Sequence, residues 1–136
     1  MHEPIWPTFD YLGIGLNEDS LLDYTKNISS NAYTHAYVQL DNRWQSHYGD
    51  LSLDGMKFTD PIGLASQLKE YSFRANMWSH LFVNTDAIVF TNVTTSALVV
   101  RDTQNTMKII TWDYGYGVSV DATNANARQW SASPDF

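Results

Sequence analysis

The chain has 136 residues, of which 43% are hydrophobic, 14% are aromatic and only 17% are charged. This composition can build a core, and it excludes a disordered tail, which is rich in charge and poor in aromatic residues, and a coiled coil. The net charge of −7 argues against nucleic-acid binding, and the absence of Cys excludes disulfides and thiolate metal sites.

The chain begins with residues 1–16, which are rich in Pro and Gly and are expected to form an irregular arm. Its start lacks the basic and apolar regions of a signal peptide, so we expect a cytoplasmic protein. No apolar stretch is long enough to span a membrane. Residues 17–20 are typical of a helix start, and apolar residues at helical spacing follow as far as Leu40. We therefore expect one long helix that ends near Asp41 and Asn42.

The middle of the chain is expected to form a hairpin and then a short helix. Asp54 and Gly55 stand between alternating apolar residues, a pattern typical of a tight hairpin over residues 50–58. Asp60 then suits the N-cap of a helix and Pro61 its first position. An apolar face continues from there as far as Tyr71.

The remaining sequence favours strands. Residues 80–90, 94–100 and 107–120 are rich in β-branched and aromatic residues, and residues 121–136 are expected to form an extended tail anchored by Trp130. This order predicts a single α+β domain over residues 1–136. In it, a curved antiparallel or mixed sheet wraps on the long helix and encloses a cone-shaped cavity.

Three stretches resemble the NTF2-like superfamily, in particular its SnoaL-like and scytalone-dehydratase-like branch. They are Asp41-Asn42-Arg43-Trp44, residues 54–64, and Ser79-His80-Leu81-Phe82-Val83-Asn84. The resemblance covers roughly residues 18–120. It implies a cone fold, a homodimer and a pocket for an apolar or aromatic ring compound. The family's activities include dehydration, isomerisation and cyclisation.

The resemblance implies that His80 is catalytic, since a neutral imidazole can exchange a proton near pH 7. The alternative is a His that only hydrogen-bonds a neighbouring strand. Asp41 matches an acidic residue of the family that would orient His80 or a water, and its alternative is a solvent-exposed residue at a helix end. Leu40 stands where the dehydratases have Tyr, which weighs against that specific activity. The pattern leaves open which late-strand acid, Asp102 or Asp113, faces the pocket.

The aromatic residues are candidates to line the pocket, with core packing as the alternative for most of them. The candidate substrate-binding residues are Tyr33, Tyr37, Tyr48, Trp112 and Tyr114. His35 and His47 complete no metal-ligand pattern, so we expect neither a metal nor another cofactor.

We therefore expect a small-molecule pocket protein that acts as a lyase, isomerase or cyclase by acid–base chemistry. The alternative is a non-catalytic binding or assembly module, including a structural protein of a virion, in which the aromatic residues form an interface.

Overall fold

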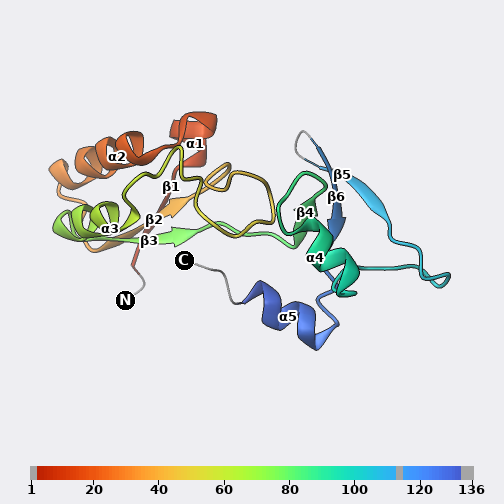
Figure 1. The fold of residues 1–136 in the computed structure, drawn as a ribbon. Helices are drawn as coiled ribbons and strands as arrows, with labels where there is room; N and C mark the ends of the chain where they lie inside the picture. The colour runs from red at the N-terminus through yellow and green to blue at the C-terminus, as the bar shows by residue number, and fades with distance from the viewer. Residues whose placement is uncertain (1–2, 113–114, 133–136) are drawn as a thin grey trace. The chain divides into compact units, whose positions relative to one another are not determined.

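The computed structural model describes residues 3–112 and 115–132. The chain divides into two compact units, which we call unit 1 (Met1–Trp44 and Leu53–Trp78) and unit 2 (Gln45–Ser52 and Ser79–Phe136). Figure 1 shows the helices and strands of both units. Each unit has a hydrophobic core of its own. The single domain expected from the sequence stays a prediction.

Unit 1 is built on a parallel sheet of three strands in the order β1-β2-β3. The strands are β1 (Ile5–Pro7), β2 (Ala36–Leu40) and β3 (Phe73–Met77). A short helix, α1 (Phe9–Leu12), and a 3-10 turn, η1 (Gly13–Gly15), follow β1 in the segment expected to be an irregular arm. Because the three strands run in the same direction, their carboxyl ends meet at one edge of the sheet.

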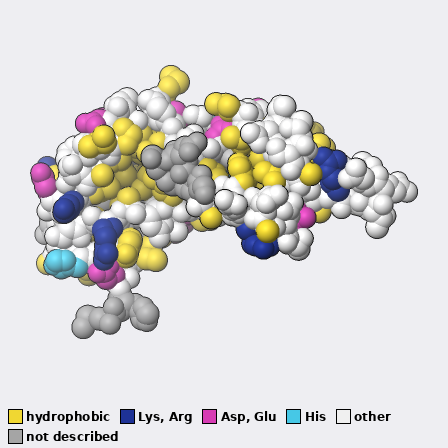
Figure 2. Space-filling model, turned by 60° about the horizontal axis from the view of Figure 1, so that its bottom comes forward, with side chains coloured by type: hydrophobic (Ala, Val, Ile, Leu, Met, Phe, Trp, Pro, Cys, Tyr) yellow, Lys and Arg dark blue, Asp and Glu magenta, His cyan; other side chains and the backbone are white. Residues whose placement is uncertain are grey.

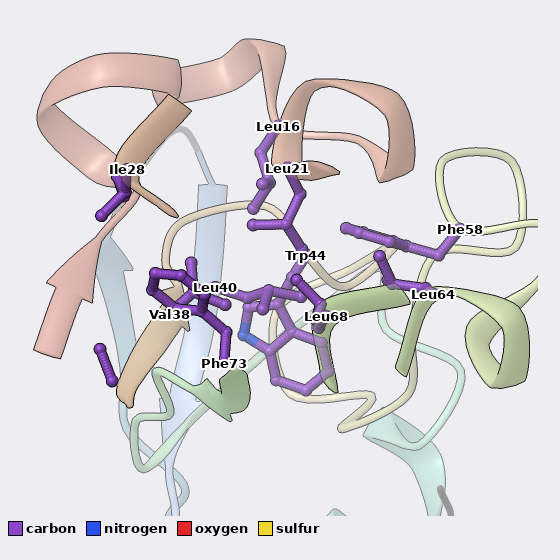
Figure 3. Packing of buried hydrophobic residues seen from close by; sticks show 11 residues of the cluster. Leu16, Leu21, Ile28, Val38, Leu40, Trp44, Phe58, Leu64, Leu68 and Phe73 are labelled. Carbon is purple, nitrogen blue, oxygen red and sulfur yellow. The ribbon is translucent and has the colours of Figure 1, made fainter. Parts of the chain in front are cut away.

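Two helices, α2 (Glu18–Ser30) and α3 (Pro61–Glu70), accompany the sheet (Figure 1). Their buried side chains form one core with those of β2 and β3. Alternate residues of β2 are buried, so this core lies on one face of the sheet. Figure 3 shows the buried side chains pointing toward one another. The core residues are Leu16, Leu21, Ile28, Ala36, Val38, Leu40, Trp44, Phe58, Leu64, Leu68 and Phe73.

The predicted starts of both helices are confirmed. Asn17 caps α2 by accepting a hydrogen bond from the backbone N–H of Ser20, whose hydroxyl accepts one from the backbone N–H of Asn17. Asp60 caps α3 by accepting from the backbone N–H of Gly63, and Pro61 is the first helical residue. These short-range patterns depend only on neighbouring residues, and therefore the sequence reveals them.

The prediction of one helix as far as Leu40 is wrong, since α2 ends at residue 30 and β2 begins at Ala36. Ala32 and His35 adopt positive φ values of 65° and 58°, which interrupt the helix. Ala36 and Leu40 are four residues apart, a spacing that fits both a helix and a strand. Val38, which is fully buried between them, decides for the strand.

The predicted hairpin over residues 50–58 is also wrong. Asp54 does make a turn, because its carbonyl accepts from the backbone N–H groups of Lys57 and Phe58 and its side chain accepts from that of Met56. Residues 50–58 nevertheless form no pair of strands, and Leu51 has a positive φ of 53°.

Unit 2 contains a small antiparallel sheet of three strands in the order β4-β6-β5. The strands are β4 (Phe82–Asn84), β5 (Ile109–Trp112) and β6 (Gly115–Ser119), and the helices are α4 (Phe90–Thr95) and α5 (Ala125–Ser131). Their buried side chains form the second core. It comprises Val83, Ala87, Val93, Leu98, Val99, Val118, Val120 and Ala127.

Three predicted strands of this region need correction. Residues 80–90 form only the three-residue β4 before a turn. Of residues 94–100, the first two end α4, and Val99 makes only an isolated bridge with Val120. Val93 is fully buried in α4, so its packing overrides the strand preference of its β-branched neighbours. Residues 107–120 form two strands, in which Trp112 pairs with Gly115. The segment expected to be an extended tail contains α5, and Trp130 packs against the core.

The predicted cone fold is therefore wrong. A sheet was expected to wrap on one long helix. In the described ranges, the residues predicted to form that helix instead form α2 and the strand β2. Unit 1 instead repeats strand and helix around a parallel sheet, an arrangement typical of α/β folds.

Candidate functional site

The carboxyl ends of the strands in unit 1 bring one carboxylate, Asp41, next to the end of β1. The backbone N–H of Asp41, directly after β2, donates to the hydroxyl of Thr8, directly after β1, at 3.0 Å. Thr8 is 1% exposed, and its own N–H donates to the carbonyl of Gln39 at 3.1 Å. Oδ1 of Asp41 accepts from the N–H of Asn42 at 2.7 Å. These bonds fix the position of the carboxylate relative to the sheet.

Trp44 ties the end of β2 to the end of β3. Its indole is 1% exposed and donates from Nε1 to the carbonyl of Trp78 at 2.7 Å. The N–H of Trp78 in turn donates to the carbonyl of Leu40 at 2.9 Å. Lys57 donates from Nζ to the carbonyl of Arg43 at 2.8 Å, a further contact to the loop that contains Asp41. These hydrogen bonds give the loop a defined position, as a binding carboxylate requires.

Unit 2 contains a cluster of four rings, which we call the aromatic cluster: Tyr48, His80, Phe82 and Trp112. The ring of Trp112 lies 4.8 Å from that of Tyr48, 4.7 Å from that of His80 and 5.3 Å from that of Phe82, measured between centroids. His80 meets Tyr48 edge-on at 5.3 Å. Nδ1 of His80 accepts from the backbone N–H of Phe82 at 3.2 Å, which places the proton of a neutral ring on Nε2.

Buried polar groups hold the loop that carries Tyr48. Oε1 of Gln45, a residue 4% exposed, accepts from the backbone N–H groups of Gly49 and Leu51. Gly49 has a φ of +104°, and a Cβ atom there would lie 2.7 Å from Cα of Val83, so this position requires glycine. The carbonyl of Tyr48 accepts from the N–H of Asn84 at 2.8 Å, which fixes the loop against β4.

The predicted site residues are distributed over both units. Asp41 belongs to unit 1 and His80 to unit 2, so their predicted partnership stays a prediction. The structure brings Tyr48 and Trp112 together with His80, whose catalytic role also stays a prediction. Tyr114, like Asp113, lies outside the described residues.

Two predicted pocket residues, Tyr33 and Tyr37, lie apart in unit 1. Tyr33 is 57% exposed and lines a hollow of about 430 Å³ beside α2. Tyr37 lines a different hollow, of about 790 Å³, beside α3, where the guanidinium of Arg74 lies 4.7 Å from its ring centre. Asp102 is exposed and uses Oδ1 to accept from two backbone N–H groups of its own turn.

Sequence reasoning missed the residues that hold the candidate site in place. Thr8 and Gln45 are buried polar residues whose partners are distant or depend on loop geometry, and no local pattern reveals them. Trp44 was recognised only as part of a family resemblance. Its hydrogen bond to the carbonyl of Trp78 joins residues 34 positions apart in the chain.

Within residues 3–112 and 115–132, no group of three or more His, Asp or Glu side chains is placed to hold a metal ion. In the same ranges, no helix has the length and apolar character needed to cross a membrane.

Comparison with known proteins decides the family. Residues 8–134 match the family described as "Glycosyl hydrolases family 31 TIM-barrel domain". The chain belongs to this family. A mouse relative, the myogenesis-regulating glycosidase, is 27% identical over 129 residues, which are 94% of this chain and 18% of the relative.

Solved structures of glycosidases share the fold of this family 31 chain. An α-galactosidase from Thermus thermophilus matches 97% of this chain and 28% of its own, with a TM-score of 0.80 and 22% identity. A family 31 dextranase from Flavobacterium johnsoniae matches 97% of this chain and 16% of its own, with a TM-score of 0.84 and 15% identity. The chain thus spans less than a third of the length of each of these relatives.

These findings overturn the resemblance to the NTF2-like superfamily and its SnoaL-like and scytalone-dehydratase-like branch. They also contradict the predicted cone fold and the predicted lyase, isomerase or cyclase activity. The alternatives of a non-catalytic module or a virion protein are contradicted as well. The misleading likeness has a physical origin. The likeness rests on Asp41 followed by Trp44 and on the helix cap at Asp60. In unit 1 these residues stabilise the end of a parallel strand and the start of a helix, features that a cone fold also contains.

Proposed function

We propose that this chain supplies a sugar-binding part of a family 31 glycoside hydrolase, and that Asp41 binds hydroxyl groups of the sugar. The position of Asp41 carries the proposal. In TIM-barrel enzymes the site is built from the loops at the carboxyl ends of the parallel strands, and Asp41 directly follows β2 at that edge.

A carboxylate suits this role because it accepts strong hydrogen bonds from hydroxyl donors. Oδ1 of Asp41 already accepts from the N–H of Asn42, and an ionised carboxylate has about four acceptor positions in all. The contact with Thr8 keeps the backbone of Asp41 in place, so little ordering is needed when a sugar binds.

The substrate class that we propose is an α-linked glycoside. The similar solved structures are named as an α-galactosidase, an α-xylosidase and a dextranase. In this proposal a sugar takes the place of the apolar or aromatic ring compound that the resemblance implied.

Glycoside hydrolysis generally uses two carboxyl groups, one as general acid and one as nucleophile or base, and needs no cofactor. We assign to Asp41 the binding of hydroxyl groups and leave the two reacting carboxyl groups unassigned. Homodimer formation and a cytoplasmic location stay predictions from the sequence.

The half-buried rings of His80, Phe82 and Trp112 in the aromatic cluster of unit 2 are proposed as a second sugar-binding surface, while Tyr48 is only 8% exposed and packs against them. Tyr and Trp combine a flat apolar face, which suits the C–H face of a sugar ring, with a polar group at the edge. Three of its four members, Tyr48, His80 and Trp112, were singled out from the sequence, although for a different ligand.

The experiment is a titration of the 136-residue chain with p-nitrophenyl α-D-galactopyranoside and with the matching α-xyloside and α-glucoside, followed by NMR. We expect saturable shifts of the backbone amides of residues 41–44 and 78 with at least one sugar. Asp41→Asn should weaken that binding about 10- to 100-fold, the equivalent of one charged hydrogen bond. Asp23→Asn, which changes an exposed carboxylate of α2, is the matched control and should bind as the wild type does.

Two results would overturn the proposal. One is the absence of shifts at these amides with all three sugars. The other is an Asp41→Asn variant that binds the sugar as tightly as the Asp23→Asn control does.

A further inference from the structure

A buried amide, that of Asn84, lies on the same face of the small sheet as the aromatic cluster of unit 2. Asn84 ends β4 and is only 7% exposed. Its Oδ1 atom is buried and has no hydrogen-bond partner among the described residues. A buried polar atom without a partner is costly to the folded state, so each such atom in a native protein needs an explanation.

The register of the sheet places this amide beside the rings. Asn84 and Phe82 alternate along β4 and therefore share one face of the sheet. Asn84 pairs with Gly117 of β6, and the next residue of β6 on that face, Gly115, pairs with Trp112. The rings of Phe82 and Trp112 meet at 5.3 Å between centroids, so this face of the sheet carries the aromatic cluster.

Two glycines leave the space that the amide occupies. A Cβ atom on Gly115 would lie 2.9 Å from Nδ2 of Asn84, and one on Gly117 would lie 3.2 Å from its Oδ1. A Cβ atom on Gly117 would also lie 2.8 Å from the carbonyl oxygen of Val83. The sequence thus makes room for a polar side chain next to the rings and provides it with no partner among the described residues.

The backbone of Asn84, and not its side chain, holds the local structure. Its N–H donates to the carbonyl of Tyr48 at 2.8 Å, and its carbonyl accepts from the N–H of Ala87 at 3.1 Å. Any residue except proline could form both bonds. An apolar side chain of the same size would avoid the unpartnered Oδ1, so a ligand that supplies a hydrogen-bond donor explains the amide better than the fold does.

We propose that Asn84 selects the ligand of the aromatic cluster: its amide oxygen accepts a hydrogen bond from a hydroxyl group of a neutral pyranose whose C–H face packs on Trp112. This inference rests on the proposed sugar-binding surface of unit 2. Rotation of the amide about the Cβ–Cγ bond brings the oxygen to the less buried position now held by Nδ2. The rotation breaks no hydrogen bond of Oδ1, because Oδ1 has none among the described residues.

The chemistry of the cluster favours a neutral sugar. Its four rings carry no formal charge when His80 is neutral, and an amide oxygen repels the carboxylate or sulfate group of an acidic sugar. Hydrophobic side chains reach the surface elsewhere too, as Figure 2 shows over unit 1. An apolar surface alone gives little specificity, whereas a buried acceptor favours the sugars that place a hydroxyl group against it.

The test compares Asn84→Leu with Asn126→Leu, which makes the same change at an exposed position of α5. NMR of the 136-residue chain follows the indole N–H of Trp112 and the backbone N–H of Gly117. The added ligands are methyl α-D-galactopyranoside, methyl α-D-glucopyranoside and methyl α-D-xylopyranoside. Cyclohexyl methyl ether, which has a six-membered ring but no hydroxyl group, measures packing on the rings alone.

We expect Asn84→Leu to weaken the binding of at least one sugar about 3- to 10-fold, the equivalent of one neutral hydrogen bond. Its affinity for cyclohexyl methyl ether should stay the same, and Asn126→Leu should bind both kinds of ligand as the wild type does. The urea midpoint of Asn84→Leu should equal or exceed that of the wild type, since the amide has no partner to lose. In the wild type, the side-chain N–H signals of Asn84 should shift with the sugar and not with the ether.

Each of three results contradicts this role of Asn84. The first is an Asn84→Leu variant that binds every sugar as tightly as Asn126→Leu does. The second is an equal loss of affinity for sugar and ether, or a lower urea midpoint, either of which indicates a structural role. The third is the absence of any shift of the Asn84 side-chain signals with the three sugars.

Failure of this inference is distinguishable from failure of the sugar-binding surface. If no sugar shifts the indole signal of Trp112 in the wild type, the surface itself is refuted and the role of Asn84 with it. If a sugar shifts that signal and binds Asn84→Leu equally well, the surface stands and only the role of Asn84 is refuted.

Discussion

The hydrogen bond between Trp44 and Trp78 should contribute measurably to the stability of unit 1. Trp44→Phe keeps an aromatic ring in the core but removes the Nε1 donor that lies 2.7 Å from the carbonyl of Trp78. Loss of the bond costs about 1 kcal/mol, and the smaller ring leaves a space in a residue site that is only 1% exposed. Together with roughly 1–2 kcal/mol for that space, we expect a loss of about 2–3 kcal/mol in the free energy of unfolding.

Urea unfolding followed by tryptophan fluorescence measures this effect. With a denaturant slope of about 2 kcal/mol per molar urea, the midpoint should fall by about 1 M. Trp78→Phe is the matched control, because Trp78 accepts the bond through its backbone carbonyl, which the substitution keeps. The reasoning is refuted if Trp44→Phe unfolds within about 0.5 kcal/mol of the wild type, or if the control loses as much stability.

Three further predictions concern local features. Asp60→Ala should destabilise α3 by about 1 kcal/mol, because the cap of the Gly63 N–H is lost, while Asp60→Asn should keep most of it; urea midpoints and far-ultraviolet circular dichroism compare the two. Gly49→Ala should cost about 2–4 kcal/mol of stability, since its φ is +104° and its Cβ would meet the backbone of β4, whereas Gly55→Ala, with open space around it, should cost less than about 1 kcal/mol. Burial, and then a nearby carboxylate, raise the pKa of Tyr24 above 10.0, so the folded state holds this proton more tightly and stability falls as pH rises from 10.0 through the folded pKa. Tyr24→Phe should therefore lose less stability than the wild type between about pH 9 and pH 11, and equal losses in urea midpoints would contradict this.

Part of the candidate site could be recognised in the sequence. Asp41 stood out as an acid at the end of an ordered element, and Tyr48, His80 and Trp112 stood out in a chain with few charges. Their chemistry was assigned to the wrong family, because an acid, a His and a set of aromatic rings fit an acid–base pocket as readily as a sugar-binding surface. The hydrogen bonds between Thr8 and Asp41 and between Trp44 and Trp78 cannot be predicted from the spacing of residues in the sequence, because each joins segments more than thirty residues apart.

The sequence by itself determined the features that neighbouring residues control. The caps at Asn17 and Asp60 are such features, since their partners lie three residues away in the chain. Tertiary structure alone decided whether Ala36 and Leu40 belong to a helix or to a strand. Their spacing fits both, and the choice was made by the burial of Val38 between β1 and β3 and by the positive φ angles that precede it.

The abundance of aromatic residues was visible from the composition, but their destinations were not. In the folded protein, Trp44 lies in the core of unit 1 and Trp112 in the aromatic cluster of unit 2, while Tyr33 lines an exposed hollow beside α2. The physical reason is that the apolar face of a Tyr or Trp ring can pack, and its polar group can find a hydrogen-bond partner, in a core, on a ligand or against another segment. Which of these it meets depends on strands brought together from distant parts of the chain.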